Sequence, residues 1–260
     1  MGASFYECTV NDGKQSIDKK EQPDTMLISK SQNIRISGST LKLLATTSMI
    51  VDHLAHFNYW DNEEFQKELY TIGNLEITPY FLMRAFGRLA FPIFAFLIVE
   101  GFFHTKNHFK YGRNLLLFAL ISEIPWNLAH EGAWHYPTQN VFFTLFLGYL
   151  GVCCLAYLKE ETTKKVATLL LLLGFSFILR ADYGYRGFAY ILMLYALRNQ
   201  KLLKSVLGCC MLSSACIAGL AFIPINLYNG NRGFIKGPVW KLCFYAFYPV
   251  HLMLLYILSN

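Results

Sequence analysis

The chain has 260 residues, of which 54% are hydrophobic and only 15% carry a charge, against about 25% charged residues in a typical soluble domain. This composition excludes an ordinary soluble protein, and the net charge of +6 does not indicate nucleic acid as a partner. The basic residues fall in short loops between apolar runs, which indicates membrane topology and contact with anionic lipid headgroups.

A helix that crosses a bilayer needs about 20 mainly apolar residues. Residues 1–38 are polar and mixed in charge, so we expect a flexible cytoplasmic tail before one membrane domain at 39–260. About eight runs of crossing character follow, at 40–57, 85–103, 112–130, 139–158, 164–180, 184–197, 203–223 and 239–258. The sequence therefore predicts an all-α fold, a polytopic integral membrane helical bundle.

The loops between these runs predict the orientation. Lysine and arginine are concentrated in every second loop, at 104–113, 159–165 and 198–204, whereas the first loop is acidic. Under the positive-inside rule both termini then lie in the cytoplasm. The seventh loop is the exception, because it is assigned to the outer face and still carries Arg232 and Lys236.

The first run contains Asp52 and His53, although titratable groups are costly in hydrocarbon and usually line a cavity, form pairs or do chemistry. Imidazole titrates near neutral pH, so His53 is the candidate general base. Adjacent helix positions point about 100° apart, so we expect Asp52 to pair with His56, one turn away. The alternative for His53 is an interfacial histidine wetted by headgroup water.

Arg88 is the second candidate, since a guanidinium there would bind a carboxylate, a phosphate or Asp52. The alternative is an arginine that snorkels to the interface.

Further polar residues fall at three predicted depths, which together suggest a path from the inner face to the outer one. At the outer level, beside His53 and Arg88, lie Arg84, Asn140 and Asp182. At the midplane lie Glu123, Thr144 and His251. At the inner face lie Glu100, His104, Lys106, Lys110 and Arg113, a cluster whose cations would hold the phosphates of a nucleotide-like cofactor.

His104 and His108 have the spacing of two metal ligands on one helical face. A zinc signature also needs a glutamate beside the first histidine, and Thr105 stands there instead. We therefore predict no metal site.

Several segments together resemble the TraX family of membrane proteins. They include Met49-Ile-Val-Asp-His53, Gly87-Arg-Leu-Ala-Phe-Pro-Ile-Phe94, Glu100-Gly-Phe-Phe-His-Thr-Lys-Asn107 and Phe244-Tyr-Ala-Phe-Tyr-Pro-Val-His-Leu252. The resemblance implies a multi-pass protein of the bacterial inner membrane that belongs to conjugation systems and N-acetylates pilin subunits.

The chain is also similar to the wider group of transmembrane acyltransferases, in which a first-helix histidine serves catalysis and acetyl-CoA is drawn from the cytoplasm. That similarity implies that His53 is catalytic, with Asp52 and Arg88 beside it. Gly87-Arg88 would belong to the acceptor side, and the segment from Glu100 to Arg113 to the donor side. The acceptor would be a protein, a glycan or a lipid at the outer face.

Two other functions stay open. A proton-coupled transporter would relay protons through Asp52, Glu123 and His251, although the sequence contains no internal repeat of the transporter kind. A non-catalytic scaffold for pilus or secretion assembly would need none of these groups for chemistry.

Overall fold

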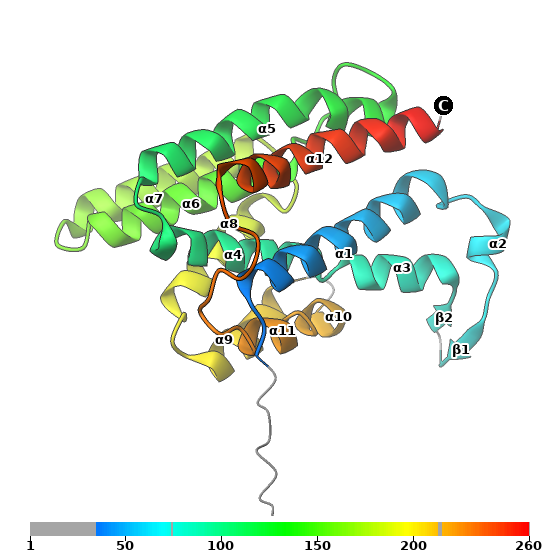
Figure 1. Cartoon of the computed structure of the whole chain (residues 1–260), viewed down its shortest axis with the longest axis horizontal. Coiled ribbons are helices and arrows are strands. Elements are labelled where there is room, and N and C mark those ends of the chain that lie inside the picture. The colour runs from blue at the N-terminus through cyan, green and yellow to red at the C-terminus, as the bar shows by residue number, and fades with distance from the viewer. Residues whose placement is uncertain (1–34, 74, 213–214, 260) are drawn as a thin grey trace, which may run out of the picture. The chain divides into compact units, whose positions relative to one another are not determined.

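The computed structural model describes residues 35–73, 75–212 and 215–259, which belong to one compact unit (Figure 1). Its helices are α1 (Gly38–Asn58), α2 (Glu63–Gln66), α3 (Pro79–Gly87), α4 (Ala90–His104), α5 (His108–Glu131), α6 (Val141–Tyr157), α7 (Thr162–Ile178), α8 (Gly184–Ala196), α9 (Lys201–Met211), α10 (Ala215–Gly219), α11 (Phe222–Asn226) and α12 (Pro238–Ser259). The mostly helical architecture confirms the predicted class. The predicted tail lies outside the described residues up to residue 34.

The first loop contains a small element that the sequence analysis did not predict. Strands β1 (Tyr70–Ile72) and β2 (Leu75–Ile77) pair antiparallel there, with Tyr70 opposite Ile77. This hairpin forms part of the connection between α2 and α3 and interrupts none of the long helices.

Short polar side chains fix where the helices begin. Ser37, Thr78, Asn107 and Asn140 each accept a hydrogen bond from a backbone N–H two or three residues later. These bonds satisfy N–H groups that have no partner in the first turn of a helix. Gly132, with φ of 63°, ends α5 in the left-handed conformation that glycine adopts without strain.

Helices α1 and α12 run parallel to each other. Lys42 near the start of α1 lies over the ring of Phe244 near the start of α12, and at the other end Asn58 donates to Ser259 Oγ at 3.0 Å. The start of α1 and the end of α12 therefore lie at opposite ends of the pair. If α1 and α12 both cross a membrane, the start of α1 and the end of α12 lie on opposite sides of it. The predicted orientation places both termini on the cytoplasmic side.

The reason lies in the run 203–223, which was predicted to be one crossing. It is instead a hairpin in which α9 goes out and α10 and α11 return, because Lys201 Nζ donates to Asn226 O and Asn226 Nδ2 donates to Ser205 Oγ. Gly208 makes the close approach possible, since a Cβ there would run into the ring of Phe222. The other seven predicted runs coincide with helices to within a few residues, except that α3 extends the second run back to residue 79.

The loop after the hairpin lies against the start of α1. Ile36 N–H donates to Leu227 O at 3.0 Å, and Gly38 N–H donates to Asn231 O at 2.8 Å. The segment 227–231 is therefore held at the end of α1 where Lys42 lies, and Arg232 and Lys236 follow directly after it. This loop therefore lies at the same end of α1 as Lys42, and not at the opposite end where the predicted topology places it.

The long helices pack as neighbours that the chain order does not give. α5 lies along α12, and α6 packs against both α5 and α8 (Figure 1). Pro79–His104, which is α3 with α4, and Val239–Ser259 are long and apolar enough to cross a membrane, while Val141–Tyr157 and Ile217–Asn226 are shorter apolar helices.

Helix α7 exposes an apolar surface. Its exposed side chains include Leu170, Leu171, Phe175, Phe177 and Ile178, and only Ser176 is fully buried. An apolar face without a protein partner among the described residues suits contact with lipid. These helices together indicate a membrane protein.

Candidate active site

The centre of the site is a pair of histidines from the first and last long helices. His53 Nδ1 lies 2.7 Å from His251 Nε2, and the two rings are parallel to within 3°. His251 Nδ1 lies 3.0 Å from the carbonyl oxygen of Phe247, and a carbonyl only accepts, so we assign the proton of His251 to Nδ1. In its neutral form His251 then accepts at Nε2, His53 donates from Nδ1, and His53 Nε2 keeps a free lone pair.

Aromatic rings surround this pair. The Tyr248 ring lies 6.2 Å from that of His53 and 5.4 Å from that of His251, and Phe57 lies 5.7 Å from His53. Phe247 stacks on His251 at 5.1 Å. The His53 ring thus faces α12 rather than headgroup water. His251 was expected at the midplane, but the parallel packing of α12 places it level with His53.

Asp52 lies beside the histidine pair and binds an arginine of α3. Arg84 Nη1 is 2.8 Å from Asp52 Oδ2 and also donates to the Asp52 carbonyl at 3.3 Å. The predicted pair with His56 is not formed, because α3 packs along α1 and brings Arg84 to the carboxylate. The His56 ring instead lies against those of Phe57 and His130.

A glycine creates the space that Asp52 occupies. A Cβ on Gly87 would collide with the Asp52 side chain. Ser48 Oγ fixes the same crossing by donating to Phe86 O at 2.7 Å, near the end of α3. The Asp52 atom Oδ1 is buried and has no hydrogen-bond partner, so this carboxylate has unused accepting capacity.

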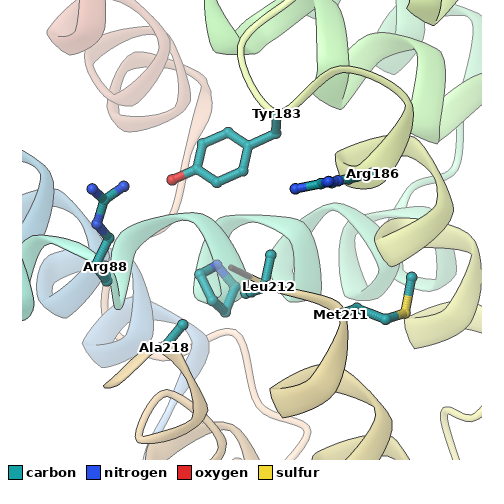
Figure 2. Close-up of a pocket in the computed structure, with 7 residues that line it drawn as sticks. Arg88, Tyr183, Arg186, Met211, Leu212 and Ala218 are labelled. Atoms are coloured by element: carbon teal, nitrogen blue, oxygen red, sulfur yellow. The ribbon is translucent and has the colours of Figure 1, made fainter. Parts of the chain in front are cut away.

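Arg88, the second predicted site residue, lines a pocket of about 250 Å³ together with Pro92, Tyr183, Arg186, Met211, Leu212 and Ala218. Figure 2 shows the Tyr183 ring between the two arginines, with its hydroxyl on the Arg88 side. Neither arginine forms an ion pair with a carboxylate in the described part of the chain. Arg88 and Arg186 thus give this pocket two guanidinium groups, the kind of side chain that binds carboxylates and phosphates.

The α7–α8 connection carries Asp182 next to this pocket. Burial raises the pKa of Asp182 to about 6, partly offset by a hydrogen bond from the Tyr183 backbone, while the charge of Asp52 raises it further. Asp52 and Asp182 therefore lie near each other, as predicted for the outer level. Thr144 Oγ1 donates to the Asp182 carbonyl, which places this predicted midplane residue at the same connection.

Two other predicted residues of the path tie helices together. Asn140 Nδ2 donates to Glu123 Oε2 at 2.6 Å and to Ala119 O at 2.8 Å. This contact joins the start of α6 to α5. Both residues therefore serve the contact between α5 and α6, and neither lines the Arg88 pocket.

The inner cluster is divided. Glu100 is buried and its carboxylate lies 2.8 Å from Arg198 Nε and 3.6 Å from His104 Nε2. It therefore joins α4 to the turn that follows α8 instead of facing a ligand. Lys106, Lys110 and Arg113 are exposed and line neither of the two pockets, so the structure does not gather the predicted donor site.

A second pocket, which the sequence analysis missed, is a groove of about 130 Å³ bounded by α1 and α12 and by residues of α4, α5 and α6. We call it the α1–α12 groove, and it is lined by Lys42, Thr46, Met49, Phe94, Leu97, Ile98, Leu115, Val141, Phe142, Leu145, Lys241, Phe244, Tyr245, Phe247 and Tyr248. The spacing of Lys42, Thr46, Met49 and His53 on one face of the first helix was a signal for it. The partner face could not be known before α12 was placed.

Comparisons with known proteins identify a family that the chain resembles. A family model described as "TraX protein" matches residues 37–259. The chain is 30% identical over 254 residues to the probable fimbrial assembly protein FimC, serogroup H1, of Dichelobacter nodosus, a match that covers 86% of this chain and 96% of that protein. No solved structure matches.

Proposed function

The chain belongs to the TraX family, and from this membership and the geometry of the site we propose that it is a membrane acetyltransferase of pilus or fimbrial assembly. It crosses the bacterial inner membrane several times and takes an acetyl group from acetyl-CoA on the cytoplasmic side. It transfers that group to an acceptor at the outer face. The N-terminal amine of a pilin subunit is the acceptor that fits the fimbrial assembly relative.

The observation that carries this proposal is the His53–His251 pair. The hydrogen bond fixes the His53 ring and leaves Nε2 free to accept a proton, which is what a general base requires. The acceptor nitrogen attacks the thioester carbonyl carbon, and His53 removes a proton from that nitrogen. The C–N bond forms, the C–S bond breaks, and the proton passes from His53 to the leaving sulfur, so coenzyme A departs as the thiol.

Charged groups beside the pair support the transfer. The Arg84 guanidinium neutralises Asp52, so the site does not hold an unbalanced carboxylate next to the developing negative charge. Arg88 and Arg186 hold an anionic group of the acceptor in their pocket. A preorganised cation near the carbonyl oxygen lowers the barrier, because negative charge develops on that oxygen in the transition state.

The test is transfer of labelled acetyl from acetyl-CoA to a pilin substrate by the detergent-purified protein. We expect His53→Gln to reduce turnover by about 10²-fold or more, the usual contribution of a general base. His135→Gln is the matched control, since His135 is exposed on the loop after α5. Normal turnover in folded His53→Gln protein would remove His53 from the chemistry.

Binding separates this function from the alternatives. A protein that uses acetyl-CoA is stabilised by it through mass action, by about 2.7 kcal/mol at a concentration of 100 Kd. A transporter or a scaffold that does not bind acetyl-CoA shows no such rise in its unfolding temperature. Absence of both protection and transfer would refute the acetyltransferase.

A further inference from the structure

We propose that the α1–α12 groove is the binding site of the acyl donor, a coenzyme A thioester. Its phosphates bind Lys42, Arg232 and Lys241 at one end, and its pantetheine arm lies along the groove toward His53. This inference rests on the proposed function, and it names a binding site different from the basic loop that the sequence predicts.

The positive end of the groove is the first observation. Lys42 and Lys241 line the same groove, and Lys42 lies close enough to Arg232 and to Lys241 to be repelled by each of them. None of the three forms an ion pair with a described carboxylate. Like charges that are held together without a counter-charge destabilise a fold, and a bound polyphosphate would relieve that repulsion.

Specific contacts hold Arg232 in this place. Ser39 Oγ donates to the Arg232 carbonyl at 2.8 Å and accepts from Ile235 N–H at 2.8 Å. The side chain of Ser39 is buried, and Gly233, with φ of 87°, packs against the hydroxyls of Ser37 and Ser39. The loop is thus fixed on the start of α1, and the charge cluster is a built feature of the fold.

Two helix N-termini add to the positive potential. Helices α1 and α12 both begin at this end, because they run parallel. Each N-terminus carries about half a positive charge and N–H groups without helical partners. An anion at Lys42 and Lys241 therefore lies near two favourable dipoles as well as three cations.

The groove extends from these cations to Tyr248, whose ring contacts that of the candidate base. On α1 it follows Lys42, Thr46 and Met49, and the next residue on that face is His53. The distance along the helix from Lys42 to His53 is about 16 Å, which is comparable to the length of an extended pantetheine arm. At the far end Tyr248 lines the groove and also contacts both histidine rings.

Apart from its two lysines the groove has a mostly apolar lining. This lining suits a chain with few charges, such as the arm between the phosphates and the thioester sulfur. An anionic lipid has the same combination of phosphate and apolar chain. The path to His53 favours the thioester, since a lipid tail would gain nothing from ending at two imidazoles.

The experiment measures donor binding and turnover in Lys42→Ala and Lys241→Ala, with Lys159→Ala as the control. Lys159 is exposed on the loop between α6 and α7, so its removal changes the charge equally without touching the groove. We expect each groove variant to raise the KM for acetyl-CoA about tenfold, the effect of losing one charged hydrogen bond, with kcat little changed. Lys159→Ala should match the wild type.

Two probes show which part of the donor binds where. Coenzyme A should protect the wild type against thermal unfolding more than it protects Lys42→Ala. Pantetheine, which has no phosphate, should protect both equally. Thr46→Trp fills the middle of the groove and should remove protection by both probes, provided that its own unfolding temperature shows it to be folded.

The outcomes distinguish the site from the function. If acetyl transfer occurs but Lys42→Ala and Lys241→Ala keep a wild-type KM while Lys106→Ala or Lys110→Ala raises it, the site is wrong and the function stands. If coenzyme A binds with the expected variant pattern but no acetyl transfer is found, the site stands and the function fails. If phosphatidylglycerol in nanodiscs protects through Lys42 and coenzyme A does not, the groove is a lipid site and the proposal is overturned.

Discussion

His53 and His251 are 198 residues apart in the chain, and their ring nitrogens lie 2.7 Å from each other. The contact joins α1 to α12, which run in the same direction because Lys42 lies over the Phe244 ring at one end of the pair and Asn58 donates to Ser259 Oγ at the other. Both histidine rings also lie against Tyr248, which lines the α1–α12 groove. This contact thus sets the surroundings of the candidate base, while the contacts at the two ends of the helix pair set the direction of α12.

The role of His251 as a positioning residue predicts a graded response. His251→Phe keeps a ring but removes the acceptor at Nε2, so the His53 ring loses its fixed orientation. We expect kcat for acetyl transfer to fall by about 10²-fold, the typical effect of a misplaced group, with KM for acetyl-CoA unchanged. His251→Gln offers an amide oxygen near the Nε2 position and should recover part of the rate. Equal activity of the two variants would show that the hydrogen bond has no role in orienting His53.

The parallel packing predicts the side on which the chain ends. If the start of α1 is cytoplasmic, the end of α12 is outside. Alkaline phosphatase fused after residue 260 should therefore be active in cells, and a green fluorescent protein fused there should be dark. The same reporters placed in the loop at Lys236 should give the opposite result. A fluorescent C-terminal fusion would contradict the direction of α12.

The close approach of Gly87 to Asp52 predicts a steric effect on stability. Gly87→Ala places a methyl group where the carboxylate lies, so we expect the Asp52–Arg84 ion pair to be displaced and the free energy of unfolding to fall by about 1–3 kcal/mol. Gly174→Ala is the control, because nothing lies within 4 Å of a Cβ at that position. The measurement is thermal unfolding in detergent, and identical unfolding temperatures for the two variants would refute the contact.

The contacts of Glu100 predict a structural effect where the sequence suggested a donor contact. Glu100→Gln leaves Arg198 without its carboxylate partner, and breaking a buried pair from one side costs about 3 kcal/mol or more. Arg198 is partly exposed, so the loss should lie at the low end of that range. We expect a lower unfolding temperature and an unchanged KM for acetyl-CoA. A raised KM without a loss of stability would return Glu100 to the donor site.

The sequence by itself determined the helices and the residues to watch. Apolar runs long enough to cross a bilayer have one stable local structure, because unsatisfied backbone groups are too costly in hydrocarbon. For that reason six of the eight predicted runs appear as helices with nearly the predicted bounds, and the second as α3 and α4 together. Titratable residues inside such runs stand out against their surroundings, which is how Asp52, His53 and Arg88 were found.

Only the tertiary structure decided which residues meet. The run 203–223 is apolar enough for a crossing, and its turn depends on a helix–helix contact between Gly208 and Phe222 that hydropathy does not record. That turn reverses the direction of α12, brings His251 to His53, and places Lys241 beside Lys42. Pairing between distant segments is a property of packing in three dimensions, so local sequence patterns could propose the partners but could not choose among them.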